Sequence, residues 1–228
     1  MVGVILGAGK GTRLRPFTFF LPKPLLPYPR RSLVRRQISF LQELGCKRIF
    51  VTKGYKGSVL EFFLKRYDFI KTINVSNKGN AYFLFELITQ GCREKVVVIT
   101  SDNFINLDTK KFLSNVVNSS NSFVVCVPGY LAREGDVAVL ESQKILEIRR
   151  SESPYGKHLL SGLQVINLLD LEEMKFDSNL NFYNVWEHLI KQGKLSLAFF
   201  DSVDWCAIDR PKDLVHAFTS RFNVYPKN

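Results

Sequence analysis

The feature that most constrains the fold is a short apolar run that leads directly into a glycine-rich loop. Residues 2–6 read Val-Gly-Val-Ile-Leu, and Gly7, Gly9 and Gly11 follow at alternate positions. A short apolar run bounded by turn residues is typical of a strand that is buried on both faces. Closely spaced glycines let the backbone curl and turn its amides toward phosphate oxygens. The start of the chain therefore predicts a buried strand that ends in an anion-binding loop.

Strands and helices then alternate at short spacing along the first half of the chain. We predict strands at residues 48–53, 70–76 and 95–100, and helices at residues 33–44, 57–67 and 80–89. The first of these helices has Ser32 as its N-cap and Gly45 as its stop signal. Such alternation predicts a mainly parallel sheet that is covered by helices on both sides.

The second half of the chain is less regular. We predict helices at residues 108–118, 182–192 and 211–222, strands at 122–128, 162–167 and 195–200, and a hairpin of strands 137–141 and 144–149 that turns at Ser142-Gln143. No linker or repeat separates the halves, so we expect one domain over residues 1–228, with a small β-rich lobe around residues 128–165. The predicted fold class is α/β, with a mainly parallel, Rossmann-like mixed sheet and helices on both faces.

Two polar loops follow predicted strands at their carboxyl ends. One is the glycine-rich loop after Leu6, and the other is Ser101-Asp102-Asn103, which follows the buried run Val96–Ile99. Ligands of parallel α/β sheets bind at the carboxyl ends of the strands. The sequence therefore places both loops at the same edge of the sheet.

The glycine spacing can be tested against two common phosphate-binding loops. A Walker A loop requires Gly-Lys-Ser/Thr with an earlier glycine at a fixed distance, but Lys10 is followed by Gly11 and the earlier position holds Val4. The dinucleotide fingerprint requires Gly-x-Gly-x-x-Gly, whereas this loop reads Gly-x-Gly-x-Gly. The spacing therefore excludes both.

Cations accompany the loop. Arg13 lies at its end, and prolines flank Lys23 in Pro22-Lys23-Pro24. Prolines stiffen the backbone and so hold the Lys23 ammonium in place. A glycine turn with one fixed arginine and one fixed lysine predicts a triphosphate cradle. The alternative is a glycine-rich turn with solvated cations, which accounts less well for the two halves together.

These residues resemble the signature of a known family. Gly-x-Gly-x-Arg-Leu-x-Pro followed by Pro-Lys-Pro-Leu-Leu-Pro is similar to the signature of the nucleoside-diphosphate-sugar pyrophosphorylases, a group of nucleotidylyltransferases that includes sugar-1-phosphate, phosphocholine and inositol-1-phosphate enzymes. The matching positions are Gly9, Gly11, Thr12, Arg13, Leu14, Pro16, Pro22, Lys23, Pro24 and Leu25. The family usually has alanine where Gly7 stands.

The resemblance implies a fold, a reaction and a division of the chain. The fold is of the nucleotide-diphospho-sugar transferase type, with a nucleotide-binding part at about residues 1–127 and an acceptor-binding part at about 128–228. The reaction moves a nucleoside monophosphate from a nucleoside triphosphate to a small phosphorylated acceptor, and pyrophosphate leaves.

The resemblance also implies roles for individual residues. Arg13 would bind the β- and γ-phosphates, and Lys23 would bind the α-phosphate and the attacking oxygen. The nucleotide is expected to contact Leu6, Gly7, Ala8, Gly9, Lys10, Gly11, Thr12, Asn80 and Ser101.

Magnesium is the expected cofactor. Asp102 matches the family's first metal-binding aspartate, and Trp205–Leu214 resembles the motif Trp-x-Asp-x-Asp-Thr-Pro-Glu-Asp-Leu, whose second aspartate matches Asp209. Ala207 replaces the first aspartate of that motif. Mg²⁺ usually takes one or two carboxylates together with substrate phosphates. The simpler roles are a turn residue for Asp102 and a helix N-cap for Asp209.

Asn80 bears on the choice of nucleotide. Residues 78–84 resemble the Asn-x-Tyr-Ser-Leu element of the cytidylyltransferases more than the Gly-Thr-Ala/Gly element of the sugar nucleotide enzymes. The Asn80 amide could read a cytosine edge, or Asn80 could simply cap a helix. We therefore favour CTP, with UTP- or dTTP-dependent sugar-1-phosphate chemistry as an alternative.

The acceptor site departs from the family pattern. The Glu-Lys-Pro element of the sugar enzymes is replaced by Arg149-Arg150-Ser151-Glu152. The acceptor-binding candidates are therefore Lys157, Arg149 and Gly162. A phosphocholine acceptor would need a cage of aromatic and acidic side chains, for which the candidates are Tyr183, Trp186 and Glu187. We favour inositol-1-phosphate or a similar polyol phosphate over phosphocholine.

The net charge of +11 is the one unusual bulk property. It is compatible with nucleic acid, an anionic membrane surface or small polyanions such as nucleotides. The non-enzyme alternative is thus a basic regulatory or nucleic-acid-binding protein on a degenerate transferase fold.

Other sequence features limit the remaining classes. The cysteines and histidines show no zinc-like spacing. No apolar run is long enough to cross a bilayer, and the N-terminus lacks the pattern of a secretory signal. We expect a cytoplasmic protein with no membrane partner and no nucleic-acid partner, and a homo-oligomer is compatible with the sequence.

Overall fold

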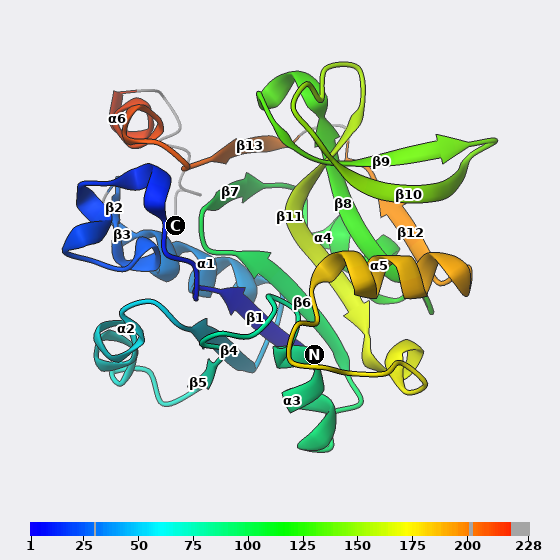
Figure 1. Ribbon diagram of the computed structural model, residues 1–228, viewed down its shortest axis with the longest axis horizontal. Helices are drawn as coiled ribbons and strands as arrows, with labels where there is room; N and C mark the ends of the chain where they lie inside the picture. Colours follow the sequence, from blue (N-terminus) through cyan, green and yellow to red (C-terminus); the bar gives the residue numbers. More distant parts are fainter. Residues whose placement is uncertain (30, 201–202, 220–228) are drawn as a thin grey trace.

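The chain folds around a mixed, mainly parallel β-sheet with helices on both faces (Figure 1). The computed structural model describes residues 1–29, 31–200 and 203–219. This architecture confirms the α/β fold class that the alternation of strands and helices predicts.

Four parallel strands form the half of the sheet that carries the glycine-rich loop. The strand β1 (Val2–Leu6) pairs with β4 (Arg48–Lys53) on one side and with β6 (Lys95–Thr100) on the other. Beyond β4 lies β5 (Ile70–Asn74), which is also parallel. Because these strands run in the same direction, the loops after β1 and β6 lie at one edge of the sheet, as predicted (Figure 1).

The other half of the sheet is largely antiparallel. The long strand β11 (His158–Asn167) pairs antiparallel with β6, and β8 (Ser122–Pro128) pairs antiparallel with β11. On its other side, β8 pairs in parallel with β12 (Leu195–Ala198). The predicted hairpin is formed by β9 (Gly135–Glu141) and β10 (Lys144–Ser151), and β9 joins the upper end of β11 (Figure 1).

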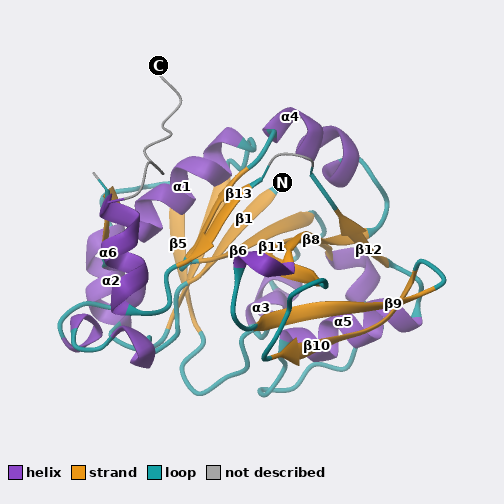
Figure 2. Cartoon of the chain, turned by 90° about the horizontal axis from the view of Figure 1, so that it is seen from above, coloured by secondary structure: helices purple, strands orange, loops and turns teal. Residues whose placement is uncertain are grey.

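Successive side chains of the central strands point to opposite faces of the sheet, and helices cover them on both faces. On β6, Val97 and Ile99 pack with the helices α1 (Leu33–Glu43), α2 (Gly57–Leu64) and α4 (Thr109–Phe112). Val96 and Val98 instead pack with α3 (Phe83–Thr89) and α5 (Phe182–Lys191). Figure 2 shows α1 and α4 on one side of the sheet and α3 and α5 on the other. None of the helices in the described part of the chain has the length and apolar character of a membrane span.

Two small sheets that the sequence did not predict lie where the N-terminal and C-terminal segments of the described chain meet. The strand β7 (Asn103–Asn106) follows β6 directly and pairs antiparallel with β13 (Asp204–Ala207). The strands β2 (Pro27–Tyr28) and β3 (Arg31–Ser32) form the other, and the C-terminal helix α6 (Pro211–Thr219) packs on β2. A third apolar cluster, which includes Leu26, Ile208 and Leu214, fills this junction.

Several predicted helices differ in their bounds. The helix predicted from residue 80 begins at Phe83, because the backbone amides of Gly79 and Ala81 donate to the 178–180 segment. The helix predicted over 108–118 consists of α4 and a π-helical turn at Leu113–Val117. The helix predicted at 57–67 ends at Leu64, and its Val59 is exposed. Residues 220–222 of the last predicted helix lie outside the described residues.

Gly162 and Gly91 provide a matched pair for testing how β11 is constrained. Both have a left-handed backbone, with φ of +82° and +79°. A Cβ at Gly162 would lie 2.1 Å from the Asn103 amide nitrogen, whereas nothing lies within 4 Å at Gly91. We expect Gly91→Ala to cost about 1 kcal/mol of unfolding free energy, and Gly162→Ala to cost about 2 kcal/mol more because of overpacking. Urea denaturation measures both, and equal losses would contradict the close approach at Gly162.

Candidate active site

The glycine-rich loop is held in place by hydrogen bonds to β4 and to neighbouring segments. The backbone amide of Gly7 donates to Thr52 Oγ1 (3.0 Å), and the Ala8 carbonyl accepts from the amide of Tyr55 (3.1 Å). Gly11 has a φ of +59°, and its carbonyl accepts from Thr18 Oγ1 (2.9 Å). A left-handed residue at this point turns the chain into the helical turn that carries Arg13.

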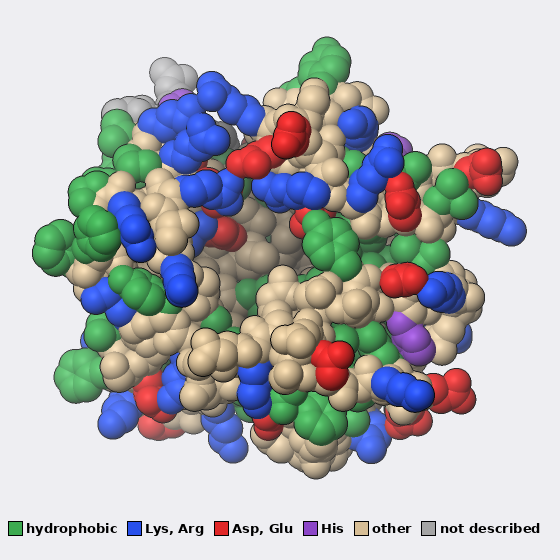
Figure 3. Space-filling view, viewed as in Figure 1, with side chains coloured by type: hydrophobic (Ala, Val, Ile, Leu, Met, Phe, Trp, Pro, Cys, Tyr) green, Lys and Arg blue, Asp and Glu red, His purple; other side chains and the backbone are tan. Residues whose placement is uncertain are grey.

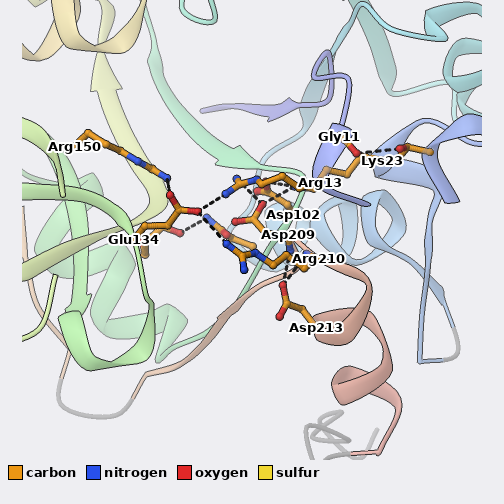
Figure 4. Close-up of polar contacts among 12 residues, drawn as sticks. Gly11, Arg13, Lys23, Asp102, Glu134, Arg150, Asp209, Arg210 and Asp213 are labelled. Atoms are coloured by element: carbon orange, nitrogen blue, oxygen red, sulfur yellow. Dashed lines mark hydrogen bonds and ion pairs between the residues drawn. The ribbon is translucent and has the colours of Figure 1, made fainter. Parts of the chain in front are cut away.

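Lys23 lies between the two predicted metal-binding aspartates. Its Nζ is 2.6 Å from Asp102 Oδ2 and 3.0 Å from Asp209 Oδ1, and only 11% of its side chain is exposed (Figure 4). Burial lowers the pKa of the Lys23 ammonium, but the two carboxylates outweigh burial and hold this pKa above its ordinary value. Burial likewise raises the pKa of Asp102, and Lys23 more than offsets it, so that this pKa lies below its ordinary value. Lys23 and Asp102 are therefore both charged at neutral pH.

The backbone brings Asp209 to Asp102 although the two are far apart in sequence. The pairing of β13 with β7 places Ala207 opposite Asn103, and the Ile208 amide donates to the Asp102 carbonyl (2.9 Å). The amides of Asp209 and Arg210 both donate to Asp213 Oδ2, at 3.0 Å and 2.7 Å. Asp213 thus satisfies free amides at the start of α6. The Asp209 side chain therefore does not serve as the cap of these amides and faces the cleft (Figure 4).

Arg13 connects this triad with the β-rich lobe. Its guanidinium is 3.0 Å from Asp209 Oδ1 through Nη2 and 2.6 Å from Glu134 Oε1 through Nη1. Glu134 in turn is 3.0 Å from Arg150 Nη2. Charged groups of alternating sign therefore run across the cleft from the glycine-rich loop to β10 (Figure 4).

The cleft contains most of the residues predicted to bind the nucleotide. A cavity of about 360 Å³ is lined by the predicted residues Leu6, Ala8, Gly9, Gly11, Thr12, Arg13, Lys23, Asn80, Ser101, Asp102 and Asp209. The other two predicted residues, Gly7 and Lys10, do not line this cavity: Gly7 is buried, and Lys10 is exposed to solvent. In Figure 3 the cleft forms a hollow at the centre of the face, with basic side chains along its upper rim and acidic side chains within.

Asn80 lines this cleft and is held there by a contact with the second half of the chain. Its Oδ1 accepts the backbone amide of Phe182 (3.0 Å), the first residue of α5. Asn80 lies before α3 begins, so it is not the cap of that helix. With its carbonyl oxygen engaged, the group that Asn80 offers a ligand is its NH₂, a hydrogen-bond donor.

An adjoining cavity of about 260 Å³ opens toward the lobe. It shares Arg13, Asn80, Asp102 and Asp209 with the first cavity and adds Gly162 from β11. Its further polar lining residues include Glu134, Asp136, Arg150, Gln164 and Tyr183. The sequence did not point to Glu134 or Asp136, because no motif marks them, and within the Arg149-Arg150 pair it favoured Arg149. The pairing of β9 with β10 sets Asp136 opposite Arg150, and Glu134 directly precedes β9.

Two of the predicted acceptor-binding residues are not part of this lining. Arg149 is exposed and pairs with Glu147 (3.2 Å), and Lys157 donates to Ser151 Oγ (3.0 Å). Both contacts lie on the face of β10 opposite to Arg150, since neighbouring residues of a strand point to opposite faces. Gly162 alone of the three predicted residues lines the cavity.

The suggested choline cage is only partly assembled. Tyr183 lines the cleft, and its hydroxyl donates to Asp136. Trp186 is nearly buried, and its indole nitrogen donates to Gln164 Oε1 (2.9 Å). Glu187 is exposed and pairs with Lys191 one turn along α5 (2.6 Å). The acidic member of the predicted cage therefore points away from the cleft.

The donor set is chemically suited to magnesium. Asp102 and Asp209 offer hard carboxylate oxygens, and they lie on either side of the same ammonium. Within the described ranges, no three His, Cys, Asp or Glu side chains gather into a site that could hold a metal ion by themselves. Mg²⁺ commonly binds one or two carboxylates and completes its shell with water and substrate phosphates. The two aspartates fit that mode.

Comparison with known proteins gives the family. The sequence profile of the "Nucleotidyl transferase" family matches residues 2–147, more than half of the chain. The chain belongs to the nucleotidyl transferase family.

Relatives with curated names include guanyl- and cytidylyltransferases. The chain is 26% identical to the mannose-1-phosphate guanyltransferase of Pichia angusta, over 94% of this chain and 62% of that protein. It is 32% identical to the choline-phosphate cytidylyltransferase of Streptococcus pneumoniae, over 55% of this chain and 53% of that protein. The chain thus spans less than two thirds of the length of these relatives.

Solved structures share the fold. A Bacillus anthracis structure described as a glucose-1-phosphate thymidylyltransferase, in complex with sucrose, superposes with a TM-score of 0.81 at 22% identity, over 100% of this chain and 98% of that chain. The inositol-1-phosphate CTP transferase of T. maritima gives a TM-score of 0.73 at 20% identity, over 93% and 91%. At these identities the likeness establishes the arrangement of the elements.

Replacing Lys23 tests how far this ammonium holds the cleft together. Lys23→Met keeps the length of the side chain but removes the ammonium between the two aspartates, so that Asp102 loses its ion pair with Lys23 and Asp209 retains its ion pair with Arg13. We expect a loss of about 2 kcal/mol of unfolding free energy in EDTA, because removing one partner of a largely buried ion pair leaves an uncompensated charge. Lys10→Met in the same loop is the control, with a change within about 0.5 kcal/mol because Lys10 is exposed. Similar losses for both variants would mean that the triad contributes little to stability.

Proposed function

We propose that this chain carries a nucleotidyltransferase site that transfers a nucleoside monophosphate from a nucleoside triphosphate to a small phosphorylated acceptor. The observation that carries the proposal is the position of Lys23 and Arg13, which line one cavity with the glycine-rich loop and with Asp102 and Asp209. Membership of the nucleotidyl transferase family supports it. Residues at about 1–127 would bind the nucleotide, and residues at about 128–228 would supply most of the acceptor site.

The residues have distinct tasks in this reaction. An oxygen of the acceptor's phosphate attacks the α-phosphorus, and the bond to the leaving pyrophosphate breaks. Lys23 would stabilise the charge on the α-phosphate, Arg13 would bind the β- and γ-phosphates, and the loop amides would orient the triphosphate. Asp102 and Asp209 would hold Mg²⁺, which neutralises phosphate charge. Before substrates bind, Lys23 and Arg13 are kept in place by these same carboxylates.

The nucleotide we favour is CTP, and GTP is the second candidate. The NH₂ group of Asn80 suits a base edge that carries hydrogen-bond acceptors. Cytosine offers its O2 and N3 atoms as such acceptors. A relative over about half of the chain is named a cytidylyltransferase. Relatives that match 94% of the chain are named guanyltransferases, which is the specific reason to test GTP. UTP and dTTP remain in the comparison because guanine, cytosine, uracil and thymine all carry carbonyl acceptors.

The acceptor we favour is inositol-1-phosphate or a similar polyol or sugar phosphate. Asp136, Gln164 and Tyr183 line the lobe side of the cleft and are side chains that bind hydroxyl groups. Phosphocholine is less well supported, because Glu187 points away and Arg150, a cation, lines the same cavity. A cation beside the cavity disfavours a quaternary ammonium through like-charge repulsion.

Pyrophosphate release from a matrix of nucleotides and acceptors tests the proposed function. CTP, GTP, UTP, dTTP and ATP are each combined with inositol-1-phosphate, mannose-1-phosphate, glucose-1-phosphate and phosphocholine, and a pyrophosphatase-coupled assay records turnover. We expect CTP with a polyol phosphate to be fastest, and EDTA to abolish release. Absence of release across the matrix, together with tight RNA binding that weakens steeply with salt, would favour the nucleic-acid-binding alternative.

Substitutions in the cradle test the assigned roles. With the best substrate pair, Arg13→Ala and Lys23→Ala are each expected to lower kcat/KM by about 10²-fold to 10³-fold, the loss typical of removing one preorganised charge from a transition state. Lys56→Ala is the control, because Lys56 precedes α2 and lies outside both cavities. Near-normal release by the Arg13 and Lys23 variants would show that the roles are wrongly assigned.

A further inference from the structure

Three guanidinium groups from separate segments converge on one carboxylate (Figure 4). Glu134 Oε1 is 2.6 Å from Arg13 Nη1 and 3.9 Å from Arg210 Nη2, and Glu134 Oε2 is 3.0 Å from Arg150 Nη2. One carboxylate cannot neutralise three cations. Even with Asp209 beside Arg13 and Asp136 at 3.7 Å from Arg150, the cluster has spare hydrogen-bond donors, since each guanidinium carries five.

The cluster is accessible to a ligand from the cleft. The side chains of Arg13, Arg150 and Arg210 are about half exposed, at 47%, 50% and 47%, and that of Glu134 is 35% exposed. Arg13, Glu134 and Arg150 line the lobe cavity. Exposed ion pairs contribute only about 0–1 kcal/mol each, so an anion from solution can displace the carboxylate at small cost.

We propose that Arg150, together with Arg13 and Arg210, binds the phosphate group of the acceptor, and that Glu134 is an internal counter-ion that fills this site until the acceptor arrives. The inference rests on the proposed function, because it places the acceptor's phosphate in the same cleft. A phosphate monoester carries up to two negative charges and three terminal oxygens, and guanidinium groups bind such oxygens in pairs. It is therefore a stronger partner for three arginines than the single charge of Glu134.

The geometry favours Arg150 over its neighbours on the strand. Arg150 pairs in register with Asp136, and both line the cavity, whereas Arg149 and Lys157 make their contacts on the other face of β10. Arg13 belongs to both cavities and is the one cation of the cluster that also lines the nucleotide cavity. A phosphate bound by Arg150 and Arg13 would thus lie next to the place proposed for the triphosphate. An oxygen of the acceptor's phosphate must lie there in order to attack the α-phosphorus.

Steady-state kinetics separates the acceptor site from the nucleotide site. Arg150→Ala is expected to raise the KM of the acceptor about tenfold or more, as for the loss of a charge-assisted bond, while the KM of the nucleotide stays within about twofold. Glu134→Gln is expected to lower the acceptor KM by roughly threefold, because the carboxylate no longer competes. Arg133→Ala and Glu147→Gln are the matched controls, since they change the same charges at exposed positions outside the lobe cavity.

Opposite kinetic results would overturn the assignment. A rise in the nucleotide KM of Arg150→Ala without a rise in the acceptor KM would place Arg150 at the nucleotide. An Arg149→Ala variant as impaired toward the acceptor as Arg150→Ala would remove the distinction between the two faces of β10. A raised acceptor KM for Glu134→Gln would mean that Glu134 orders the arginines instead of competing with the ligand.

Binding of inorganic phosphate tests the site without turnover. By calorimetry, Glu134→Gln should bind phosphate more tightly than the unmodified chain, and Arg150→Ala more weakly, with circular dichroism confirming that each variant is folded. If these shifts occur but no nucleotide is turned over, the anion site stands and the proposed function fails. If turnover occurs but neither variant changes phosphate affinity or acceptor KM, the proposed function stands and the anion site fails.

Discussion

The ion triad of Lys23, Asp102 and Asp209 is the contact on which the cleft depends. It joins a stiff proline-flanked turn near the N-terminus, the loop after the central strand β6 and the segment that precedes α6. The β7–β13 pairing and the bond from the Ile208 amide to the Asp102 carbonyl reinforce the same junction through the backbone. Removing any one charge leaves the others poorly compensated in a largely buried place. The cleft is therefore complete only when the segment that carries Lys23 has packed against the segment that carries Asp209.

From this triad a chain of alternating charges crosses the cleft through Arg13, Glu134 and Arg150. The carboxylates hold the cations in position while no substrate is bound, which reduces the reorganisation needed when phosphates arrive. The same arrangement accounts for part of the basic charge: the arginines gather where anions are proposed to bind. The solvated-cation alternative for the glycine-rich loop does not explain why Lys23 is nearly buried between two carboxylates.

Local patterns in the sequence were sufficient for the strands β1, β4, β6 and β8, because a continuous apolar run reports burial on both faces directly. Features set by tertiary contacts could not be predicted. The start of α3 at Phe83 follows from amides that bond to the 178–180 segment, and β13 exists through its pairing with β7. A bulge between Ile145 and Glu147 shifts the register of β10, so counting along the sequence does not tell which of its two arginines faces the cleft.

In the proposed reaction, an oxygen of the acceptor's phosphate attacks the α-phosphorus within this cleft. The most direct test uses the substrate pair that gives turnover, with ¹⁸O in the terminal oxygens of the acceptor phosphate, and mass spectrometry of both products. For the proposed attack, we expect all the label to remain in the nucleoside-diphosphate-linked product, with one labelled oxygen in its bridge, and the released pyrophosphate to be unlabelled. Label in pyrophosphate or in free phosphate, or turnover that does not consume the acceptor, would contradict it.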